Sequence, residues 1–404
     1  MGNERARGWL VALAGVVVLL PVVWAWRTGW WVVTAIPVGF LFGFLLQKGD
    51  LCGSSAMSEV LLFRDARKLA GLWVAIVVSM VGFAVLERLG WVTLKPKPLL
   101  WASMLVGGAI FGAGTVLAGG CISGCLYKSG GGNLNSMAAV VGMPLGIAMV
   151  EHGPLSGVHL WLKRYVVKAA DGGPVTLSSL TGLPFWLLAL LFAGGTVAVA
   201  LWLRRTGQRR AGMAPRSRGL LRRPWQPWQA GIAIGVLAVP AFLSAVASGR
   251  SYPLGITHGV LHTYELLTDA VVVETGRPAP AAAPAAGRAG PQSTAAPAVA
   301  APAPKKVSGW LIFVVVAMVP GAWVAARLSG QAKLLPKPPE QVVTAFVGGT
   351  LVGVGAAFAT GCVVGNILSG WALMSVGMFL FGLTTLLANW AVTFVYLMGT
   401  AARR

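Results

Sequence analysis

The sequence predicts an all-α, polytopic helical membrane protein that contains two inverted repeats with broken, re-entrant helices. Three observations lead to this prediction. The 404 residues are 56% hydrophobic and only 11% charged. Several apolar runs reach the roughly 20 residues that a helix needs to cross a bilayer, whereas a β-barrel would show alternating polarity. One glycine-rich stretch also occurs twice, in parts of the chain that lie far apart.

The repeated stretch covers Leu105–Met137 and begins again at Phe346. The two copies align without a gap, so that each residue of the first copy is matched to one at the same separation in the second, as residue 121 is to residue 362. The identities of the first copy are Gly107, Gly108, Gly112, Gly114, Gly120, Cys121 and Gly124, which fall on Gly348, Gly349, Gly353, Gly355, Gly361, Cys362 and Gly365. Such self-similarity indicates a duplicated unit. We expect Gly108, Gly112, Gly349 and Gly353 to form faces for close helix packing, and each helix to break at its cysteine.

Four regions follow from this reading. Residues 1–28 form a first transmembrane helix, and residues 29–160 form repeat unit 1 with Cys52 and Cys121. Residues 161–227 hold a connecting loop, a transmembrane helix and an Arg-rich cytoplasmic loop. Residues 228–404 form repeat unit 2 with Cys362, including an Ala/Pro-rich linker at 276–306 that we expect to be disordered. The expected spanning helices include Trp9–Trp26, Leu69–Leu86, Leu183–Leu203, Trp228–Val246, Trp310–Leu328 and Leu383–Met398.

The net charge of +21 is concentrated in a few places, above all in the eight arginines of Arg204–Arg223. The positive-inside rule explains such clusters and places this loop and the N-terminus in the cytoplasm. The second unit then starts on the opposite side from the first, which predicts inverted repeats. Lys163, Arg164 and Lys168 count against this orientation. A groove-reading element for nucleic acid is not visible.

A broken helix is expected around the first cysteine. The apolar run Trp30–Leu46 stops at QKGDLCGSS, and a new helix capped by Ser54 or Ser55 should run to about Phe63. Broken backbone is tolerated in a bilayer only where it lines a cavity or is buried in protein. The matching segment of the second unit, SGRSYPLGITHG, has no cysteine but contains Arg250, which we expect to supply charge in its place.

The cysteines carry the chemical hypothesis. Cys52, Cys121 and Cys362 each lie at a glycine break, and two of them are related by the repeat. We expect them to stay as neutral S–H groups in apolar surroundings. A neutral thiol is a soft, weak donor that can face a sulfur-bearing anion without repelling it. Bare backbone at the breaks can add N–H groups at half-helix N-termini, which favour anions.

The same residues carry a resemblance. DLCGSS, FGAGTVLAGGCISGCLYKSGGG and ATGCVVGNILSG resemble the YeeE/YedE family of membrane proteins, which import thiosulfate and related sulfur compounds. The resemblance implies a multi-pass protein of the bacterial inner membrane, with inverted halves and a relay of three thiols that fall on Cys52, Cys121 and Cys362. It also implies a cytoplasmic sulfur-carrier or rhodanese-like partner. Cys125 departs from the family pattern, since Asn366 stands there in the second copy.

The predicted site for the anion comprises Cys52, Cys121, Cys362, Cys125, Gly120, Gly361, Ser123 and Gly53. Further polar candidates are Ser54, Ser55, Lys128, Asn366 and Asn389, whereas Glu59, Arg64 and Asp65 are expected to form an interfacial charge cluster. The predicted partners are thiosulfate or a similar anion and the lipid bilayer. We predict no cofactor, no resident metal and no enzymatic activity. No P-loop or nucleotide fingerprint is present, so we expect transport to be passive, ion-coupled or driven by downstream trapping.

Three alternatives stay open. In the first alternative, the substrate is a selenium compound or another sulfur compound. In the second, Cys121 and Cys125 join His258 and His262 in a Cys2His2 metal site. In the third, Cys121 and Cys125 form a redox pair, although their spacing has one residue more than the usual redox motif.

Overall fold

The computed structural model describes residues 2–170, 172–206, 223–268, 307–334 and 336–398. The predicted linker at 276–306 lies wholly outside the described residues, and so does most of the Arg-rich loop. The described chain is helical, with a few isolated β-bridges between loops. Ten helical segments in it are long and apolar enough to cross a membrane, as the sequence predicts.

The elements follow one another in two similar series. The first series contains the helices α1 (Gly2–Thr28), η1 (Trp31–Thr34), α2 (Ala35–Gly49), α3 (Gly53–Phe63), α4 (Arg67–Arg88), α5 (Trp101–Leu117), α6 (Ile122–Gly130), α7 (Leu134–Glu151), α8 (Ser156–Lys163), α9 (Leu177–Thr181) and α10 (Phe185–Arg205). The second contains α11 (Pro227–Ala247), α12 (Thr257–Thr268), α13 (Gly309–Ser329), α14 (Pro339–Phe358), the π-helix η2 (Val363–Ser369), α15 (Gly370–Ala372), α16 (Val376–Val392) and η3 (Thr393–Met398).

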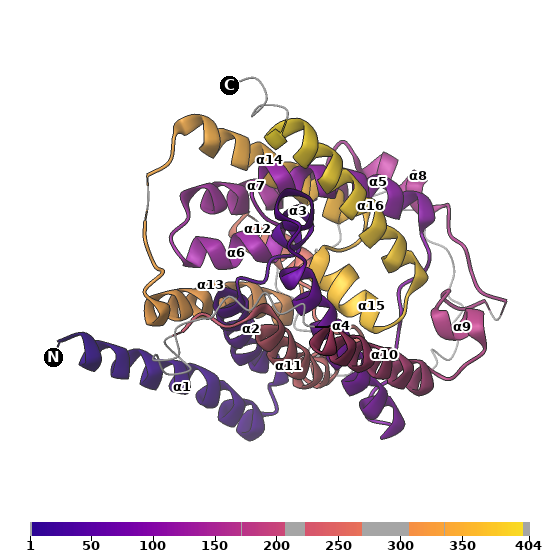
Figure 1. The fold of residues 1–404 in the computed structure, drawn as a ribbon, viewed down its shortest axis with the longest axis horizontal. Coiled ribbons are helices and arrows are strands. Elements are labelled where there is room, and N and C mark those ends of the chain that lie inside the picture. Colours follow the sequence, from indigo (N-terminus) through magenta and orange to yellow (C-terminus); the bar gives the residue numbers. More distant parts are fainter. Residues whose placement is uncertain (1, 171, 207–222, 269–306, 335, 399–404) are drawn as a thin grey trace, which may run out of the picture.

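Most of the long helices form two groups, with the short helices α3, α6 and α12 between them in the view (Figure 1). Helices α5, α7, α14 and α16 pack together on one side, and α2, α4, α11 and α13 pack together on the other. Exchanging the two series turns one set of contacts into the other: α7 packs on α14 as α16 packs on α5, and α2 packs on α13 as α11 packs on α4. The short helices α3, α6 and α12 lie in the middle of the view, and α1 lies at the edge.

Glycines allow these helices to approach backbone to backbone. A Cβ at Gly43 would lie 2.0 Å from the Met318 carbonyl oxygen, and one at Gly321 would lie 2.0 Å from the carbonyl of Phe40. The expected packing role of the repeated glycines is confirmed: Cβ atoms at Gly349 and Gly353 would each lie 2.2 Å from a carbonyl oxygen of α7. Small residues at such crossings maximise van der Waals contact where no hydrophobic effect drives association.

Gly43→Ala is expected to lower the stability of the folded protein by about 1–3 kcal/mol, the usual cost of forcing an extra methyl group into a packed site. The new methyl group would overlap the α13 backbone, so α2 and α13 would have to separate. Thermal unfolding of the purified protein in detergent measures this. Gly15→Ala on α1 is the matched control, since nothing lies within 4 Å of its Cβ position. Equal melting temperatures for the two variants would contradict the packing argument.

Three helices break where the sequence predicts. Cys52 lies between α2 and α3, Cys121 between α5 and α6, and Cys362 between α14 and η2. The predicted Ser54 or Ser55 cap is wrong in detail, because Cys52 itself is the N-cap residue and no side chain caps α3. The Ser55 hydroxyl instead donates to the Cys52 carbonyl, at 3.2 Å.

Candidate functional site

Each of the three break cysteines occupies the same position, the extended residue before a short helix. Their backbones are extended, and none of these helix starts has a side-chain cap. The first N–H groups of a helix have no partner within the helix, and the helix dipole places partial positive charge there. The folding of these segments therefore puts each cysteine at the N-terminal end of a short helix, next to its first backbone N–H groups.

Cys52 and Cys121 come from different helix breaks and touch. Their Sγ atoms lie 3.8 Å apart, and both residues are fully buried. The Ser123 hydroxyl lies 3.4 Å from the Cys121 sulfur. Gly124 makes room for this contact, because a Cβ there would lie 2.3 Å from the Cys52 sulfur and 3.5 Å from that of Cys121.

The third cysteine is joined to the other two through backbone packing. Cys362 is buried, and its thiol makes no hydrogen bond within the described residues. Its neighbour Val363 packs on Gly53, where a Cβ would lie 2.6 Å from Val363 Cγ1. Gly53 therefore allows the break that carries Cys362 to approach the break that carries Cys52. Of the predicted site residues, the structure brings Cys52, Cys121, Ser123 and Gly53 into this region.

Cys125 makes different contacts. Its thiol donates toward the carbonyl oxygens of Ala118 and Gly120, at 3.7 and 3.5 Å. Asn366, which corresponds to it in the second copy, donates its amide to the carbonyls of Ala359 and Gly361, at 2.9 and 3.0 Å. Cys125 thus contacts the backbone of the break rather than another thiol. The four cysteines are all free, and the hypothesis of a Cys121–Cys125 redox pair stays untested.

A cavity with basic residues opens beside Gly361 and therefore beside Cys362. Its volume is about 360 Å³, and its lining includes Lys97, Arg250, Tyr252, Gly255, Thr257, His258, Thr360, Gly361 and Gly365. Two donors in this lining are buried without a hydrogen-bond partner among the described residues, Arg250 Nη1 and Thr257 Oγ1. Thr257 is the first residue of α12 and is 3% exposed. Unpaired buried donors beside two cations suit a small anion.

Arg250 stands where the second unit lacks a cysteine. Gly365 faces Gly255 Cα, at 3.9 Å from its Cβ position, as Gly124 faces Cys52. Gly255 therefore takes the place of Cys52, and Arg250 Nη2 lies 2.9 Å from the Cβ position of Gly255. The expectation that Arg250 brings charge to this place agrees with this geometry.

The charges in this cavity respond differently to pH. Burial, followed by the charge of Arg250, lowers the pKa of Lys97 to about 7. Burial also lowers the pKa of Arg250 to about 10, so Arg250 stays charged at neutral pH. Burial and the nearby Lys97 lower the pKa of His258 to about 3. Lys97 is therefore the group in this cavity that titrates near neutral pH.

A second cavity, of about 260 Å³, lies beside the first copy of the break. Its lining includes Gln47, Asp50, Tyr127, Lys128, Asn133, Gln331, Lys333 and Lys337. Lys128 donates to the Gly119 carbonyl at 2.8 Å, and Tyr127 donates to Asp50 at 2.8 Å. Lys128 was one of the polar candidates, and the structure places it at this end of the cysteine region.

Two other predicted polar groups have structural partners. Asn389 donates to Thr115 Oγ1 at 3.2 Å and accepts from the Ser58 hydroxyl at 2.9 Å, which ties α16 to α5 and α3. Ser54 donates to the Thr115 carbonyl, at 3.3 Å. The predicted charge cluster exists in part: Asp65 pairs with Arg67 and Glu59 with Lys68.

The Cys2His2 metal hypothesis is wrong for the described residues, which contain no group of three or more His, Cys, Asp or Glu placed to hold a metal ion. His258 and His262 face carboxylates instead. His262 Nδ1 lies 3.0 Å from Glu265, and His258 Nε2 lies 3.9 Å from Glu151. The cysteines of the hypothesis are occupied elsewhere, because Cys121 contacts Cys52 and Cys125 contacts backbone carbonyls.

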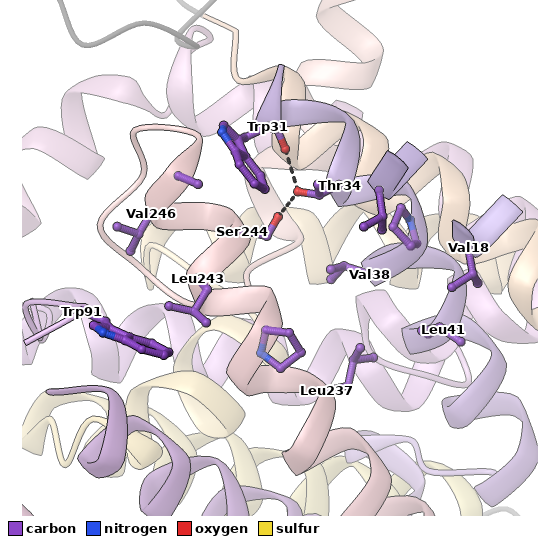
Figure 2. Close-up of a pocket in the computed structure, with 14 residues that line it drawn as sticks. Val18, Trp31, Thr34, Val38, Leu41, Trp91, Leu237, Leu243, Ser244 and Val246 are labelled. Atoms are coloured by element: carbon purple, nitrogen blue, oxygen red, sulfur yellow. Dashed lines mark hydrogen bonds between the residues drawn. The ribbon is translucent and has the colours of Figure 1, made fainter. Parts of the chain in front are cut away.

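Figure 2 shows a larger cavity, of about 590 Å³, that lies between α1, α2 and α11. Its lining is almost wholly apolar. The two hydroxyls in it, Thr34 and Ser244, bond to each other, and Thr34 also donates to the Trp31 carbonyl (Figure 2). With its polar groups already paired and no cation, this cavity does not suit an anion.

Sequence reasoning missed Lys97 and Gly255. Lys97 precedes α5 in a Lys-Pro turn, and nothing local connects it with Asn366, to which its ammonium donates at 3.0 Å. The signal that could have found Gly255 is the repeat itself, extended from the second glycine stretch back to the Leu-Gly that matches Leu51-Cys52.

The ten candidate spanning helices of the described residues and the buried core that they enclose define a multi-pass membrane protein. Residues 48–391 match the family described as sulphur transport, and the chain belongs to this family. The resemblance seen in the sequence is therefore confirmed.

Individual relatives are transporters. The chain is 29% identical over 376 residues to the thiosulfate transporter TsuA of Spirochaeta thermophila, covering 90% of this chain and 98% of that protein. It is 26% identical over 370 residues to the TsuA of Escherichia coli, covering 89% of this chain and 94% of that protein. The probable transporter YedE of Escherichia coli is 28% identical over 120 residues, which are 29% of each chain.

Proposed function

We propose that this protein imports thiosulfate or a closely related sulfur anion across the bacterial inner membrane, through a central path of the thiols of Cys52, Cys121 and Cys362. The observation that carries the proposal is the 3.8 Å contact between the Cys52 and Cys121 sulfurs. This contact occurs in a chain that spans nearly the whole length of a thiosulfate transporter. Two independently broken helices meet there, and each brings a soft, polarisable thiol.

The proposed orientation follows the positive-inside rule. The positive-inside rule places the Arg-rich segment in the cytoplasm. The backbone N–H of Trp225, which follows that segment, donates to the Lys48 carbonyl near the end of α2, so α2 ends at the cytoplasmic side. The segment after α6 lies at the same end. The Lys333 backbone N–H donates to the Gly131 carbonyl, and the neighbouring Gln331 side chain accepts from Gln47 near the end of α2. The segment after α15 lies at the other end, where the Ser375 hydroxyl donates to the Lys97 carbonyl. These contacts support inverted repeats and re-entrant breaks.

In this orientation the cavity with Lys97 and Arg250 faces outward and the cavity with Lys128 faces the cytoplasm. The outer cations attract a dianion and replace part of its hydration shell. The thiols then accept its sulfur end by weak S–H hydrogen bonds, and half-helix N-termini stabilise its charge. A cytoplasmic sulfur-carrier or rhodanese-like protein that consumes the product would draw uptake inward.

Uptake of radiolabelled thiosulfate by cells that lack their own importer tests the proposal. Cells that express the chain should accumulate the label above an empty-vector control, and unlabelled thiosulfate should compete where sulfate does not. Vector-level uptake with the protein present in the membrane would overturn thiosulfate as substrate. The alternative substrates, selenium compounds and other sulfur anions, are then read from the same assay with those labels.

Thiosulfate affinity is expected to rise as the outer pH falls from 8 to 6. Lys97 gains its proton through a pKa of about 7, so the outer cavity carries one more positive charge at the lower pH. The apparent KM for uptake at each pH measures this. Lys97→Arg should flatten the profile, since arginine stays charged throughout. An unchanged profile in that variant would assign the dependence to another group.

A further inference from the structure

We propose that Cys125 is a positioning residue and not a relay thiol: with Lys128 it fixes the backbone turn that presents Cys121, as Asn366 with Lys97 fixes the turn that presents Cys362. The inference rests on the proposed function only where uptake is the readout.

The two breaks have the same internal hydrogen bonds. Gly120 N–H donates to the Thr115 carbonyl at 3.0 Å, and Gly361 N–H donates to that of Ala356 at 2.8 Å. Two carbonyl oxygens in each turn then receive a side-chain donor from the residue four after the cysteine. In the first turn the donor is Cys125, and in the second it is Asn366, each fully buried.

In both turns, the carbonyl oxygen of the residue between these two accepts a hydrogen bond from a lysine ammonium. Lys128 donates to Gly119 O at 2.8 Å, and Lys97 donates to Thr360 O at 2.5 Å. The lysines come from unrelated places in the sequence, Lys128 from α6 and Lys97 from the loop before α5. The same three carbonyls are therefore satisfied twice by different residues. This indicates that each turn requires hydrogen-bond donors for its three backbone carbonyl oxygens.

The Asn366 amide is a stronger hydrogen-bond donor than the Cys125 thiol, and it is found in the turn whose backbone conformation is the more strained. Gly119 and Thr360 both have left-handed backbone, with φ of 68° and 53°. Glycine adopts this conformation at no steric cost, whereas threonine is strained in it. The threonine turn is held by an amide at 2.9 and 3.0 Å, and the glycine turn by a thiol at 3.5 and 3.7 Å. The weaker thiol donor is found where the turn needs less restraint.

Asparagine should fit in place of Cys125. Its amide would reach the carbonyls of Ala118 and Gly120, and its oxygen would face Lys128 as that of Asn366 faces Lys97 at 3.0 Å. Both turns have glycine at the position that contacts this side chain, Gly120 and Gly361. The second copy thus supplies a variant, Cys125→Asn, that removes the thiol and keeps the donor.

The experiment compares Cys125→Asn with Cys125→Ala in the full chain. The asparagine variant should take up thiosulfate within about twofold of wild type, and the alanine variant about tenfold more slowly at equal membrane levels, because two buried carbonyls lose their donor. The rate at which a small maleimide alkylates Cys121, measured by peptide mass spectrometry, reports the conformation of the turn independently of transport. We expect unchanged labelling in the asparagine variant and faster labelling in the alanine variant.

Failure of the asparagine variant in any form, whether low uptake, altered Cys121 labelling or absence from the membrane, overturns the proposal, since a donor without a thiol would then not suffice. An alanine variant indistinguishable from wild type overturns it as well. If wild type shows no uptake, the proposed substrate fails and the labelling comparison still decides the role of Cys125. Asn366→Cys, the reciprocal change, should keep the Cys362 labelling rate if the two donors are interchangeable.

Discussion

Gly124→Ala should reduce thiosulfate uptake roughly 5- to 150-fold, the range that corresponds to 1–3 kcal/mol of overpacking at the transport path. The added methyl group would lie 2.3 Å from the Cys52 sulfur. Either the Cys52 thiol rotates away or α6 shifts outward. Both responses separate the Cys52 and Cys121 sulfurs, which lie 3.8 Å apart in the structure.

The repeat provides the control. Gly365→Ala makes the same change at the corresponding position of the second copy, where the nearest atom to a Cβ is Gly255 Cα at 3.9 Å. That is an ordinary van der Waals distance, so this variant has no overlap to relieve and should lose much less uptake than Gly124→Ala, even though Gly365 also lines the outer cavity. Initial uptake rates normalised to the protein in the membrane measure both. Equal loss in the two variants would mean that general helix packing, and not the thiol contact, limits uptake.

Cys121→Ala is expected to abolish measurable uptake. Cys121 contacts both the Cys52 sulfur and the Ser123 hydroxyl, so its removal takes away a donor and leaves two polar groups with one partner fewer. A lost hydrogen bond costs about 0.5–1.5 kcal/mol, and a buried group left unpaired costs about 1–3 kcal/mol. The second cost alone corresponds to a loss of about 5- to 150-fold, and the missing thiol also interrupts the proposed path.

Cys121→Ser separates hydrogen bonding from sulfur chemistry at the same atom. A hydroxyl donates a hydrogen bond but cannot form a bond to the sulfur of the substrate. Partial uptake by the serine variant would support a relay of hydrogen bonds. Complete loss in both variants would favour covalent sulfur exchange, and full uptake in the alanine variant would remove Cys121 from the path.

The sequence predicts the helices and the breaks well because both leave local signals. Apolar runs end at charged or aromatic residues, and each break is marked by glycine beside cysteine, as at Gly120-Cys121 and Gly361-Cys362. The constant offset between the copies also predicts that the two breaks have the same backbone. This holds down to the individual hydrogen bonds of residues 120 and 361.

The long-range contacts of the site could not be predicted in this way. Lys97 reaches Thr360 across more than half of the chain, and Cys52 reaches Cys121 from a different helix. Both contacts depend on how the helix groups pack rather than on any local pattern. The spacing of Cys121 and Cys125 also suggested a shared metal face with His258 and His262. The backbone carbonyls of the break use Cys125 instead, because a broken helix leaves them without partners.

The contact between Cys52 and Cys121 has a consequence for how anions are told apart. It is formed by two sulfur atoms with one hydroxyl beside them. If this contact lies on the proposed path, sulfate and thiosulfate would both lose water there, and strongly hydrated oxygens would regain little from weak S–H donors. Thiosulfate presents a polarisable, less hydrated sulfur at one end and can lead with it. Discrimination at this contact is therefore expected to follow hydration energy, with charge and size nearly the same for both anions.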